Sequence, residues 1–567
     1  MHLLVTTPGE VSDGSEAVDL DQSPGDIVVL SAAASDLAIL SAAKARLPRD
    51  TPSLRLANLM QLGHNMSVDL YLEKTIAHAR LVIVRLLGGV GYWPYGVEQL
   101  HALCRRNDIA LAILPGDDQP DPALTEPSTL PVQTCHRLWQ YFVHGGPSNA
   151  ENLLRYAAAL LGEADSWVEP APLVRAGLYW PSHTHPALED IRARWQPNAS
   201  VAPIVFYRAL VQSDDLKPVD ALIAALSDRG LNALPIFVSS LKDSFSAGIV
   251  ENYVAETSPA IILNCTGFAV STPGRPEAAT PFAGADCPVL QVVLSGGDEE
   301  GWSSSQRGLS PRDLAMNVAL PEVDGRLISR AVSFKDGSSI DAETEVALVK
   351  HRPVPDRIDF VADMARGWAR LRATPANQRK IALVLANYPN KDGRLGNGVG
   401  LDTPAGVVAA LNRLTAEGYD LAQDAPNSTD SLMKVLLGGP TNAAGSRDGG
   451  VRYSVSDYEA YFAALPEPVQ KQVTERWGDP ARDPFVQDGC FVLPVHRFGR
   501  LIIGVQPARG YNVDPVTSYH DPALVPPHGY LAFYAWLREA FGAQAIIHFG
   551  KHGNLEWLPG KSLALSG

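Results

Sequence analysis

The stretch Lys380-Ile-Ala-Leu-Val-Leu385 is a short apolar run, and the glycine-rich stretch Gly393-Arg-Leu-Gly-Asn-Gly-Val-Gly400 follows it. The next segment, from about Pro404 to Glu417, has the composition of a helix. A buried strand, a glycine-rich loop and a helix in this order are typical of α/β domains with parallel sheets. The loop is also a candidate anion site, because backbone N–H groups at a helix N-terminus favour negative charge. A flexible surface turn is the alternative, and the glycine spacing does not match the dinucleotide fingerprint.

The same alternation of apolar runs and helix-length segments continues along the chain and predicts an α/β protein with three domains. Residues 1–165 are predicted to form an N-terminal α/β domain, residues 166–372 a second one, and residues 373–567 the start of a third, truncated domain. Each is expected to be Rossmann-like or flavodoxin-like with a parallel sheet, the last one incomplete. The polar stretch Gly438–Gly450 is predicted to be a disordered or lid-like loop. The main predicted strands are Ile27–Leu30, Leu81–Val84, Ile109–Ile113, Ile204–Tyr207, Ala233–Val238, Val289–Val293, Leu501–Val505 and Ala545–Ile547.

Composition and charge limit the kinds of partner. The 567 residues carry 62 Asp and Glu against 47 Lys and Arg, a net charge of −15, which disfavours nucleic acid and anionic membranes as partners. No apolar stretch is long enough to span a bilayer, and the first residues lack the pattern of a signal peptide, so a cytoplasmic protein is predicted. The five cysteines show no Cys-x-x-Cys spacing, which favours reduced thiols in the core over disulfides or a zinc site.

Side chains that could bind a metal or transfer a proton concentrate near the end of the chain, in Gln544-Ala-Ile-Ile-His-Phe-Gly-Lys-His-Gly-Asn-Leu-Glu-Trp-Leu-Pro-Gly-Lys561. Imidazole binds borderline divalent metals, and a carboxylate can bind a metal or accept a proton. His548, His552 and Glu556 recur every four residues and therefore form the candidate metal-binding set. They would converge on one face of a helix, but the glycines of this stretch favour a loop with solvated charges as the alternative. Gly560-Lys561-Ser562 lacks the leading glycine of a P-loop, so no ATP site is predicted here.

The stretch from His548 to Lys561 resembles the signature of the large subunits of metal chelatases that act on tetrapyrroles. This family contains the CobN-type large subunit of cobaltochelatase and the H subunit of magnesium chelatase. The similarity continues upstream in Gly504-Val-Gln-Pro-Ala-Arg-Gly510, Tyr519-His-Asp521 and Pro526-Pro-His-Gly-Tyr530. The cobalt branch is favoured by the amino end, around Asp13-Gly-Ser-Glu-Ala-Val-Asp19, and by Lys551, where magnesium-type sequences usually carry Thr.

The resemblance implies a substrate-binding subunit of an ATP-dependent cobaltochelatase, a ligase that inserts cobalt(II) into a corrin-ring precursor. The expected precursor is of the hydrogenobyrinic acid a,c-diamide type, and the expected pathway is cobalamin biosynthesis. Cobalt is then the substrate metal, while ATP and magnesium act on two smaller partner subunits that include an AAA+ ATPase. Large subunits of this family are much longer, so an amino-terminal fragment is expected. Two alternatives stay open: a magnesium chelatase H subunit acting on a porphyrin, and a non-catalytic tetrapyrrole-binding module.

Individual roles are assigned within this family site. Glu556 is the predicted proton acceptor for the ring nitrogens, and His548 and His552 are predicted to deliver the metal or contact the ring. Corrinoid precursors carry many carboxylates, so basic groups are expected to bind the substrate, with the Trp557 indole offering an apolar face. The predicted substrate-binding residues are Lys551, Arg509, Trp557, Lys561, His520 and His528.

Overall fold

The computed structural model describes residues 16–163, 166–272, 280–387, 392–398, 400–443, 449–510, 521, 523–551, 553 and 555–561. The chain forms two compact units, one that ends at Arg366 and also takes in the segment from Lys561, and one from Gly367 to Gly560. The first unit holds two sheets and the second holds one main sheet. Parallel strands dominate all three, which confirms the predicted α/β fold class. The three-domain division at residues 165 and 372 stays a prediction.

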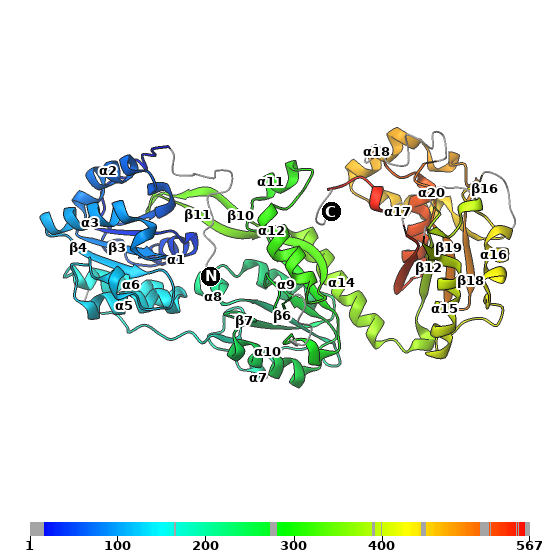
Figure 1. Ribbon diagram of the computed structural model, residues 1–567, viewed down its shortest axis with the longest axis horizontal. Helices are drawn as coiled ribbons and strands as arrows, with labels where there is room; N and C mark the ends of the chain where they lie inside the picture. Colours follow the sequence, from blue (N-terminus) through cyan, green and yellow to red (C-terminus); the bar gives the residue numbers. More distant parts are fainter. Residues whose placement is uncertain are drawn as a thin grey trace. The chain divides into compact units, whose positions relative to one another are not determined.

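The first sheet has four parallel strands in the order β2-β1-β3-β4. Its strands are β1 (Ile27–Ser31), β2 (Leu54–Asn58), β3 (Leu81–Leu86) and β4 (Ala110–Pro115). Every residue of β1 and β3 is buried, as expected for strands covered on both faces. Helices α1 (Ala34–Lys44), α5 (Val132–His144) and α6 (Pro147–Leu160) cover one face, and α2 (Asn65–Lys74) and α3 (Pro94–Arg106) cover the other (Figure 1). The arrangement is doubly wound and flavodoxin-like, as predicted.

The second sheet has seven strands in the order β11-β10-β9-β8-β6-β7-β5, with antiparallel strands at both edges. Its strands are β5 (Ala176–Leu178), β6 (Val201–Tyr207), β7 (Asn232–Val238), β8 (Ile262–Asn264), β9 (Val289–Leu294), β10 (Leu327–Asp341) and β11 (Val346–Pro353). Helices α7 (Leu188–Arg192) and α10 (Ser244–Thr257) share one hydrophobic core with it. Helix α9 (Lys217–Asp228) contacts β7 from the side away from α10 (Figure 1), and α14 (Pro355–Ala373) follows β11.

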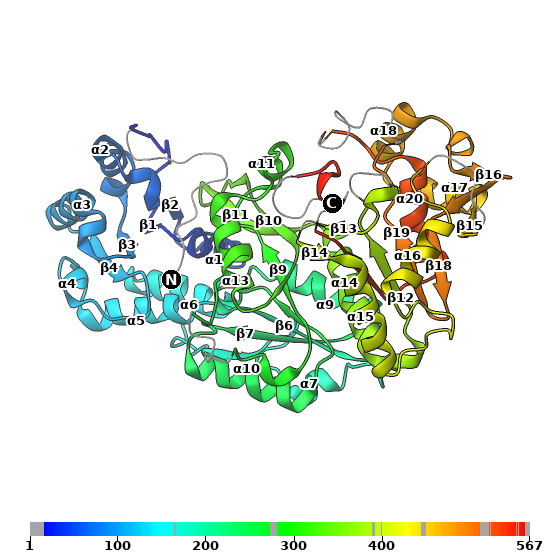
Figure 2. The same ribbon diagram turned by 45° about the vertical axis from the view of Figure 1, so that its right-hand side comes forward.

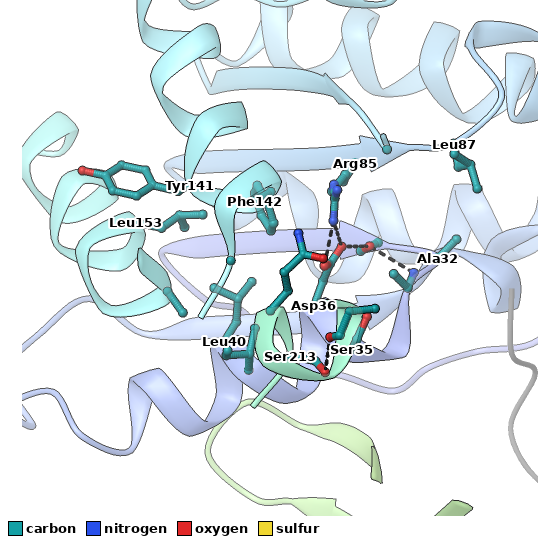
Figure 3. Close-up of a pocket in the computed structure, with 18 residues that line it drawn as sticks. Ala32, Ser35, Asp36, Leu40, Arg85, Leu87, Tyr141, Phe142, Leu153 and Ser213 are labelled. Atoms are coloured by element: carbon teal, nitrogen blue, oxygen red, sulfur yellow. Dashed lines mark hydrogen bonds and ion pairs between the residues drawn. The ribbon is translucent and has the colours of Figure 1, made fainter. Parts of the chain in front are cut away.

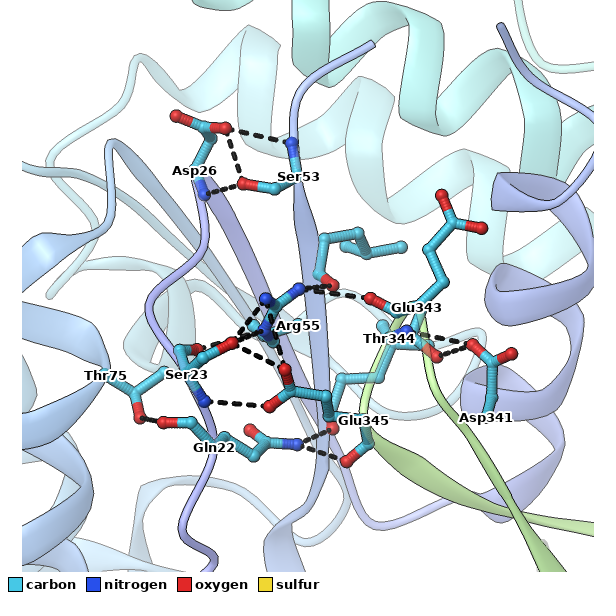
Figure 4. A network of polar contacts seen from close by, with 12 residues as sticks. Gln22, Ser23, Asp26, Ser53, Arg55, Thr75, Asp341, Glu343, Thr344 and Glu345 are labelled. Atoms are coloured by element: carbon cyan, nitrogen blue, oxygen red, sulfur yellow. Dashed lines mark hydrogen bonds and ion pairs between the residues drawn. The ribbon is translucent and has the colours of Figure 1, made fainter. Parts of the chain in front are cut away.

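The hairpin of β10 and β11 extends beyond the second sheet and reaches the first one (Figures 1 and 2). At its turn, the Thr344 carbonyl accepts a hydrogen bond from the backbone N–H of Leu56 at 3.2 Å. The Glu345 carboxylate lies 3.3 Å from the Arg55 guanidinium and accepts a hydrogen bond from the Ser23 N–H at 2.8 Å (Figure 4). Gln22 donates to the carbonyl oxygens of both Leu56 and Glu345. These contacts join the two sheets into one unit, and the sequence pattern did not predict the hairpin.

The main sheet of the second unit has the order β18-β19-β12-β20. Strands β12 (Ile381–Leu385), β19 (Leu501–Val505) and β20 (Ala545–Phe549) are parallel, and β18 (Val495–Phe498) is antiparallel. Helices α15 (Thr403–Ala416) and α16 (Thr429–Gly438) cover one face, and α17 (Val455–Ala463) and α20 (His528–Ala535) cover the other. A small antiparallel sheet of β15 (Val451–Ser454), β17 (Cys490–Leu493) and β16 (Val486–Gln487) completes the unit, with α18 (Glu467–Trp477).

One loop prediction needs correction, and a second stays a prediction. The N-terminus of α15 is capped by Asp402, whose carboxylate accepts a hydrogen bond from the Ala405 N–H at 3.0 Å. The chain's own carboxylate therefore takes the place that the glycine-rich pattern assigned to a bound anion. In the stretch predicted as a disordered or lid-like loop, Thr441 and Asn442 are buried and hydrogen-bonded, and residues 444–448 lie outside the described part of the chain, so the loop stays a prediction.

Candidate functional site

The carboxyl ends of three parallel strands meet at one edge of the sheet in the second unit. Leu385 at the end of β12 lies beside Val505 of β19 and Phe549 of β20. The segments that follow these strands start at the same edge, and one of them is the terminal motif. Ligands of open parallel sheets usually bind at this edge, so we assign it as the candidate site.

Two buried amides that were not predicted from the sequence hold this edge together. The backbone N–H of Gln506 donates to the Leu385 carbonyl at 2.9 Å, and its side-chain amide donates to the Tyr534 hydroxyl at 3.2 Å. The Asn442 side chain donates to the Gln506 carbonyl and accepts from the Ala508 N–H, each at 2.8 Å. Gln506 is part of one of the family-like stretches and could have been singled out. Asn442 sits in a polar stretch where nothing in the sequence distinguishes it.

His548 belongs to β20 and lies beside Val384 of β12 in the register of the sheet. Its ring centroid is 6.0 Å from that of Tyr534, whose hydroxyl is bound to Gln506. The side chain is exposed at its surface. The protein packed around the ring excludes part of the surrounding water, and this desolvation lowers the pKa of His548. At neutral pH the imidazole is therefore neutral, which is the form that binds a metal or accepts a proton.

Arg509 brings two parts of the predicted site together. Its guanidinium is buried, only 3% exposed, and it donates hydrogen bonds to the backbone carbonyls of Trp557 and Asp521. Trp557 ends the short helix Leu555–Trp557 within the motif. These contacts of Arg509 thus fix the backbone of the motif, and the buried cation adds positive potential beside it.

His528, the first residue of α20, lies in the core and is 1% exposed. Its Nε2 is 3.0 Å from the Gly478 carbonyl, so this nitrogen carries the proton and donates. Its Nδ1 is 2.8 Å from the Tyr458 hydroxyl and accepts from it. Burial lowers the pKa of His528, which stabilises this neutral form. Both nitrogens are used inside the fold, which favours a role in packing.

The two predicted lysines differ in position. Lys551 follows β20 directly and is exposed at the candidate edge. Lys561 belongs by its contacts to the first unit, where its ammonium donates to the carbonyls of Ser303 and Ser305 at 2.8 and 2.9 Å. It also lies 4.8 Å from the ring centroid of Trp302.

Several predicted site groups lie outside the described part of the chain. His520 and His552 are among the residues that the structure does not describe, and for Glu556 only the backbone is described. Within the described residues, no group of three or more His, Cys, Asp or Glu side chains is placed to hold a metal. Two of the three predicted metal ligands are not among those side chains, so the set of His548, His552 and Glu556 stays a prediction.

Comparisons with known proteins assign the chain to a family. The sequence model of the CobN/Magnesium Chelatase family matches residues 139–567, and the chain belongs to this family. It is 51% identical to the aerobic cobaltochelatase subunit CobN of Sinorhizobium sp. over 100% of this chain and 45% of that protein. The H subunit of magnesium chelatase from Cereibacter sphaeroides is 28% identical over 76% of this chain and 37% of that protein, a more distant relative.

A solved structure shows the same fold. The catalytic subunit of cobaltochelatase from Mycobacterium tuberculosis matches with a TM-score of 0.75 and 30% identity, over 95% of this chain and 44% of that one. The chain spans less than half the length of the cobaltochelatase subunits that it matches. The family resemblance carried by the terminal motif is confirmed. In the described part of the chain, no helix is long and apolar enough to cross a membrane.

Proposed function

We propose that this chain forms part of the large, substrate-binding subunit of an ATP-dependent cobaltochelatase. The enzyme inserts cobalt(II) into a corrin-ring precursor of the hydrogenobyrinic acid a,c-diamide type in cobalamin biosynthesis. The observation that carries the proposal is the 51% identity, over the full chain, to an aerobic cobaltochelatase subunit. The much lower identity to the H subunit of a magnesium chelatase supports cobalt over magnesium and a corrinoid over a porphyrin.

Metal insertion requires that the inner ring nitrogens lose their protons and that the metal sheds its water ligands. In the proposed mechanism Glu556 accepts ring protons, as a positioned carboxylate can do when its pKa is tuned toward neutrality. His548 and His552 carry the cobalt ion to the ring, since imidazole binds borderline metals reversibly. The lowered pKa of His548 supports this role, because a protonated imidazole cannot bind a metal.

The ring substituents would be held by the basic groups of the same edge. Lys551 is exposed directly after β20 and can pair with a ring carboxylate. Arg509 would act mainly by positioning the motif backbone and by its charge, because its described hydrogen bonds go to carbonyl oxygens. Trp557 would offer an apolar face to the macrocycle, and His520 would complete the proposed substrate-binding set. His528, whose ring nitrogens are both bound inside the fold, and Lys561, which belongs to the first unit, are not part of this set.

The energy source would lie elsewhere in the complex. Because Gly560-Lys561-Ser562 does not complete a P-loop, ATP hydrolysis with magnesium is proposed for two smaller partner subunits, one of them an AAA+ ATPase. The complex would work in the cytoplasm without nucleic acid or membrane.

Substrate choice can be tested by equilibrium binding to the full-length protein, read from quenching of its tryptophan fluorescence. A metal-free corrinoid, hydrogenobyrinic acid a,c-diamide, is expected to bind at least about tenfold more tightly than protoporphyrin, a difference of roughly 1.4 kcal/mol. Lys551→Ala should weaken corrinoid binding, whereas Lys471→Ala, an exposed lysine on α18, should leave it unchanged. Tighter binding of the porphyrin would favour the magnesium alternative.

A further inference from the structure

A pocket lies at the carboxyl edge of the first sheet, far in sequence from the terminal motif (Figure 3). In the strand order β2-β1-β3-β4, the connections leave β1 and β3 in opposite directions, so a crevice forms between their carboxyl ends. Ser31 ends β1 and lies beside Arg85 of β3, and both line the pocket. The pocket is partly open to solvent. This is the position at which doubly wound sheets bind ligands.

Arg85 is the cation of the pocket. Its side chain is 8% exposed and points toward Asp36, and its Nη1 lies 2.7 Å from both carboxylate oxygens (Figure 3). The Ser31 hydroxyl donates to the same carboxylate at 2.7 Å. Among the residues that the structure describes, none accepts a hydrogen bond from Nε or Nη2 of Arg85. Nε is enclosed by protein, so Nη2 is the donor that the guanidinium keeps for an anion in the pocket.

Around the Arg85 guanidinium, the pocket is lined by a helix N-terminus and by apolar side chains. Helix α1 starts at Ala34, and its N-cap residue Ala33 makes no side-chain capping hydrogen bond. Its first N–H groups therefore lack a side-chain acceptor and favour negative charge at this end. The Phe142 ring lies 5.2 Å from the Arg85 guanidinium carbon. The larger apolar lining residues are Ile39, Leu40, Leu87, Tyr141, Phe142 and Leu153.

We propose that this pocket is a binding site for a small organic carboxylate with an apolar body. The ligand carboxylate would accept a hydrogen bond from Nη2 of Arg85, and its apolar part would lie against Phe142 and Leu40. The ion pair with Asp36 holds the guanidinium in position. Because the Asp36 carboxylate is negative, it also limits how much negative charge a ligand in the pocket can carry. A monoanion fits this balance better than a phosphate dianion, which would meet stronger repulsion from the Asp36 carboxylate.

The test uses 4-fluorobenzoate as the probe and the neutral 4-fluorobenzamide as its matched control. Fluorine NMR line broadening is recorded with the 567-residue chain at constant ionic strength. 4-Fluorobenzoate is expected to bind with a Kd of about 1 mM or tighter, and 4-fluorobenzamide at least tenfold more weakly. Equal binding of the two probes, or no broadening by 4-fluorobenzoate, would overturn the proposal.

Three variants locate the binding. Arg85→Lys keeps the charge beside Asp36 but loses the planar fork, so it should weaken 4-fluorobenzoate at least fivefold. Ala209→Met should fill part of the pocket and weaken it as well, without touching the ion pair. Val211→Met, in the same helix Arg208–Gln212 but outside the pocket lining, should bind like the parent chain. Unchanged affinity in both pocket variants would contradict the site, and inorganic phosphate binding as tightly as 4-fluorobenzoate would contradict the ligand class.

Discussion

His351, His528 and His548 each have a lowered pKa, and burial is the main cause for all three. The three neutral rings have different surroundings and therefore different roles. The His528 ring is bound on both nitrogens inside the second unit, and the His351 ring accepts or donates at 3.2 Å to Ser333 within the second sheet. His548 lies at the candidate edge, where a neutral imidazole can meet a ligand. A lowered pKa therefore marks a site only together with its position.

The acid sensitivity of the first unit should depend on His351. Burial lowers the pKa of His351 from 6.5 to about 4 in the folded chain, so the unfolded chain binds an extra proton between these values. Stability is then complete above pH 6.5 and falls as the pH drops toward 4, by up to about 3 kcal/mol from this residue. Urea unfolding of the parent chain and of His351→Gln should show a shallower loss toward low pH in the variant. Parallel loss in both would contradict this account.

Glu556→Gln keeps the size of the side chain but removes the proposed proton acceptor. In the full-length subunit with its partners, cobalt insertion should fall by roughly 100-fold while corrinoid binding is retained. Insertion is measured from the change in corrinoid absorbance, and Glu539→Gln, an exposed glutamate of the same unit, is the matched control. Near-normal insertion by Glu556→Gln would show that another group takes the proton.

At the scale of elements, the hairpin of β10 and β11 connects two sheets that each have their own core. Its turn inserts backbone and carboxylate acceptors beside β2, where Arg55 supplies the charge partner (Figure 4). The side chains of Arg55 and Glu345 are 12% and 29% exposed, so the pair is only partly screened by water. The hairpin is therefore a local determinant of how the first unit holds together.

Glu345→Ala should loosen this connection. The substitution removes the acceptor of Ser23 and the partner of Arg55, so we expect a loss of about 1–2 kcal/mol and faster hydrogen exchange in β2 and β11. Glu343→Ala is the matched control in the same turn, because its carboxylate is half exposed and lies 3.5 Å from Lys44. Exchange in Glu345→Ala equal to that of the parent chain would show that the Glu345 contacts contribute nothing measurable.

Elements with a clear local sequence pattern were predicted correctly. Strands whose formation depends on tertiary contacts were missed. The apolar runs at Ile27, Leu81 and Leu501 became buried central strands because such strands are covered on both faces. Strand β2 was missed since Arg55 and Asn58 interrupt its apolar pattern. The long strand β10 was missed because its carboxyl part carries Lys335, Asp336 and serines, a composition typical of a loop.

The candidate site was predicted in part for the same reason. The terminal motif was expected to follow a strand, and His548 lies in β20 with Lys551 directly after it. The burial of Arg509 and His528 depends on Trp557, Asp521, Tyr458 and Gly478, which are distant along the chain. The family resemblance and the residue types assigned both to substrate binding, and the packing shows that both His528 nitrogens and two Arg509 nitrogens are hydrogen-bonded inside the fold.

At the scale of the whole molecule, the two ligand sites that we propose lie in different units. The family model starts at residue 139, after β1 to β4, while the candidate chelatase site lies within the matched part. Ser31, Asp36 and Arg85 of the proposed carboxylate pocket precede residue 139.

The central claim is that the full-length form of this protein inserts cobalt into a corrinoid with energy from partner subunits. The most direct measurement is cobalt incorporation into hydrogenobyrinic acid a,c-diamide, followed by absorbance, with and without ATP and the two smaller subunits. The account predicts insertion only when the large subunit, both partners and ATP are all present, and no ATP hydrolysis by the large subunit alone. Insertion of magnesium into a porphyrin in place of this reaction, or ATP hydrolysis by the isolated large subunit, would contradict it.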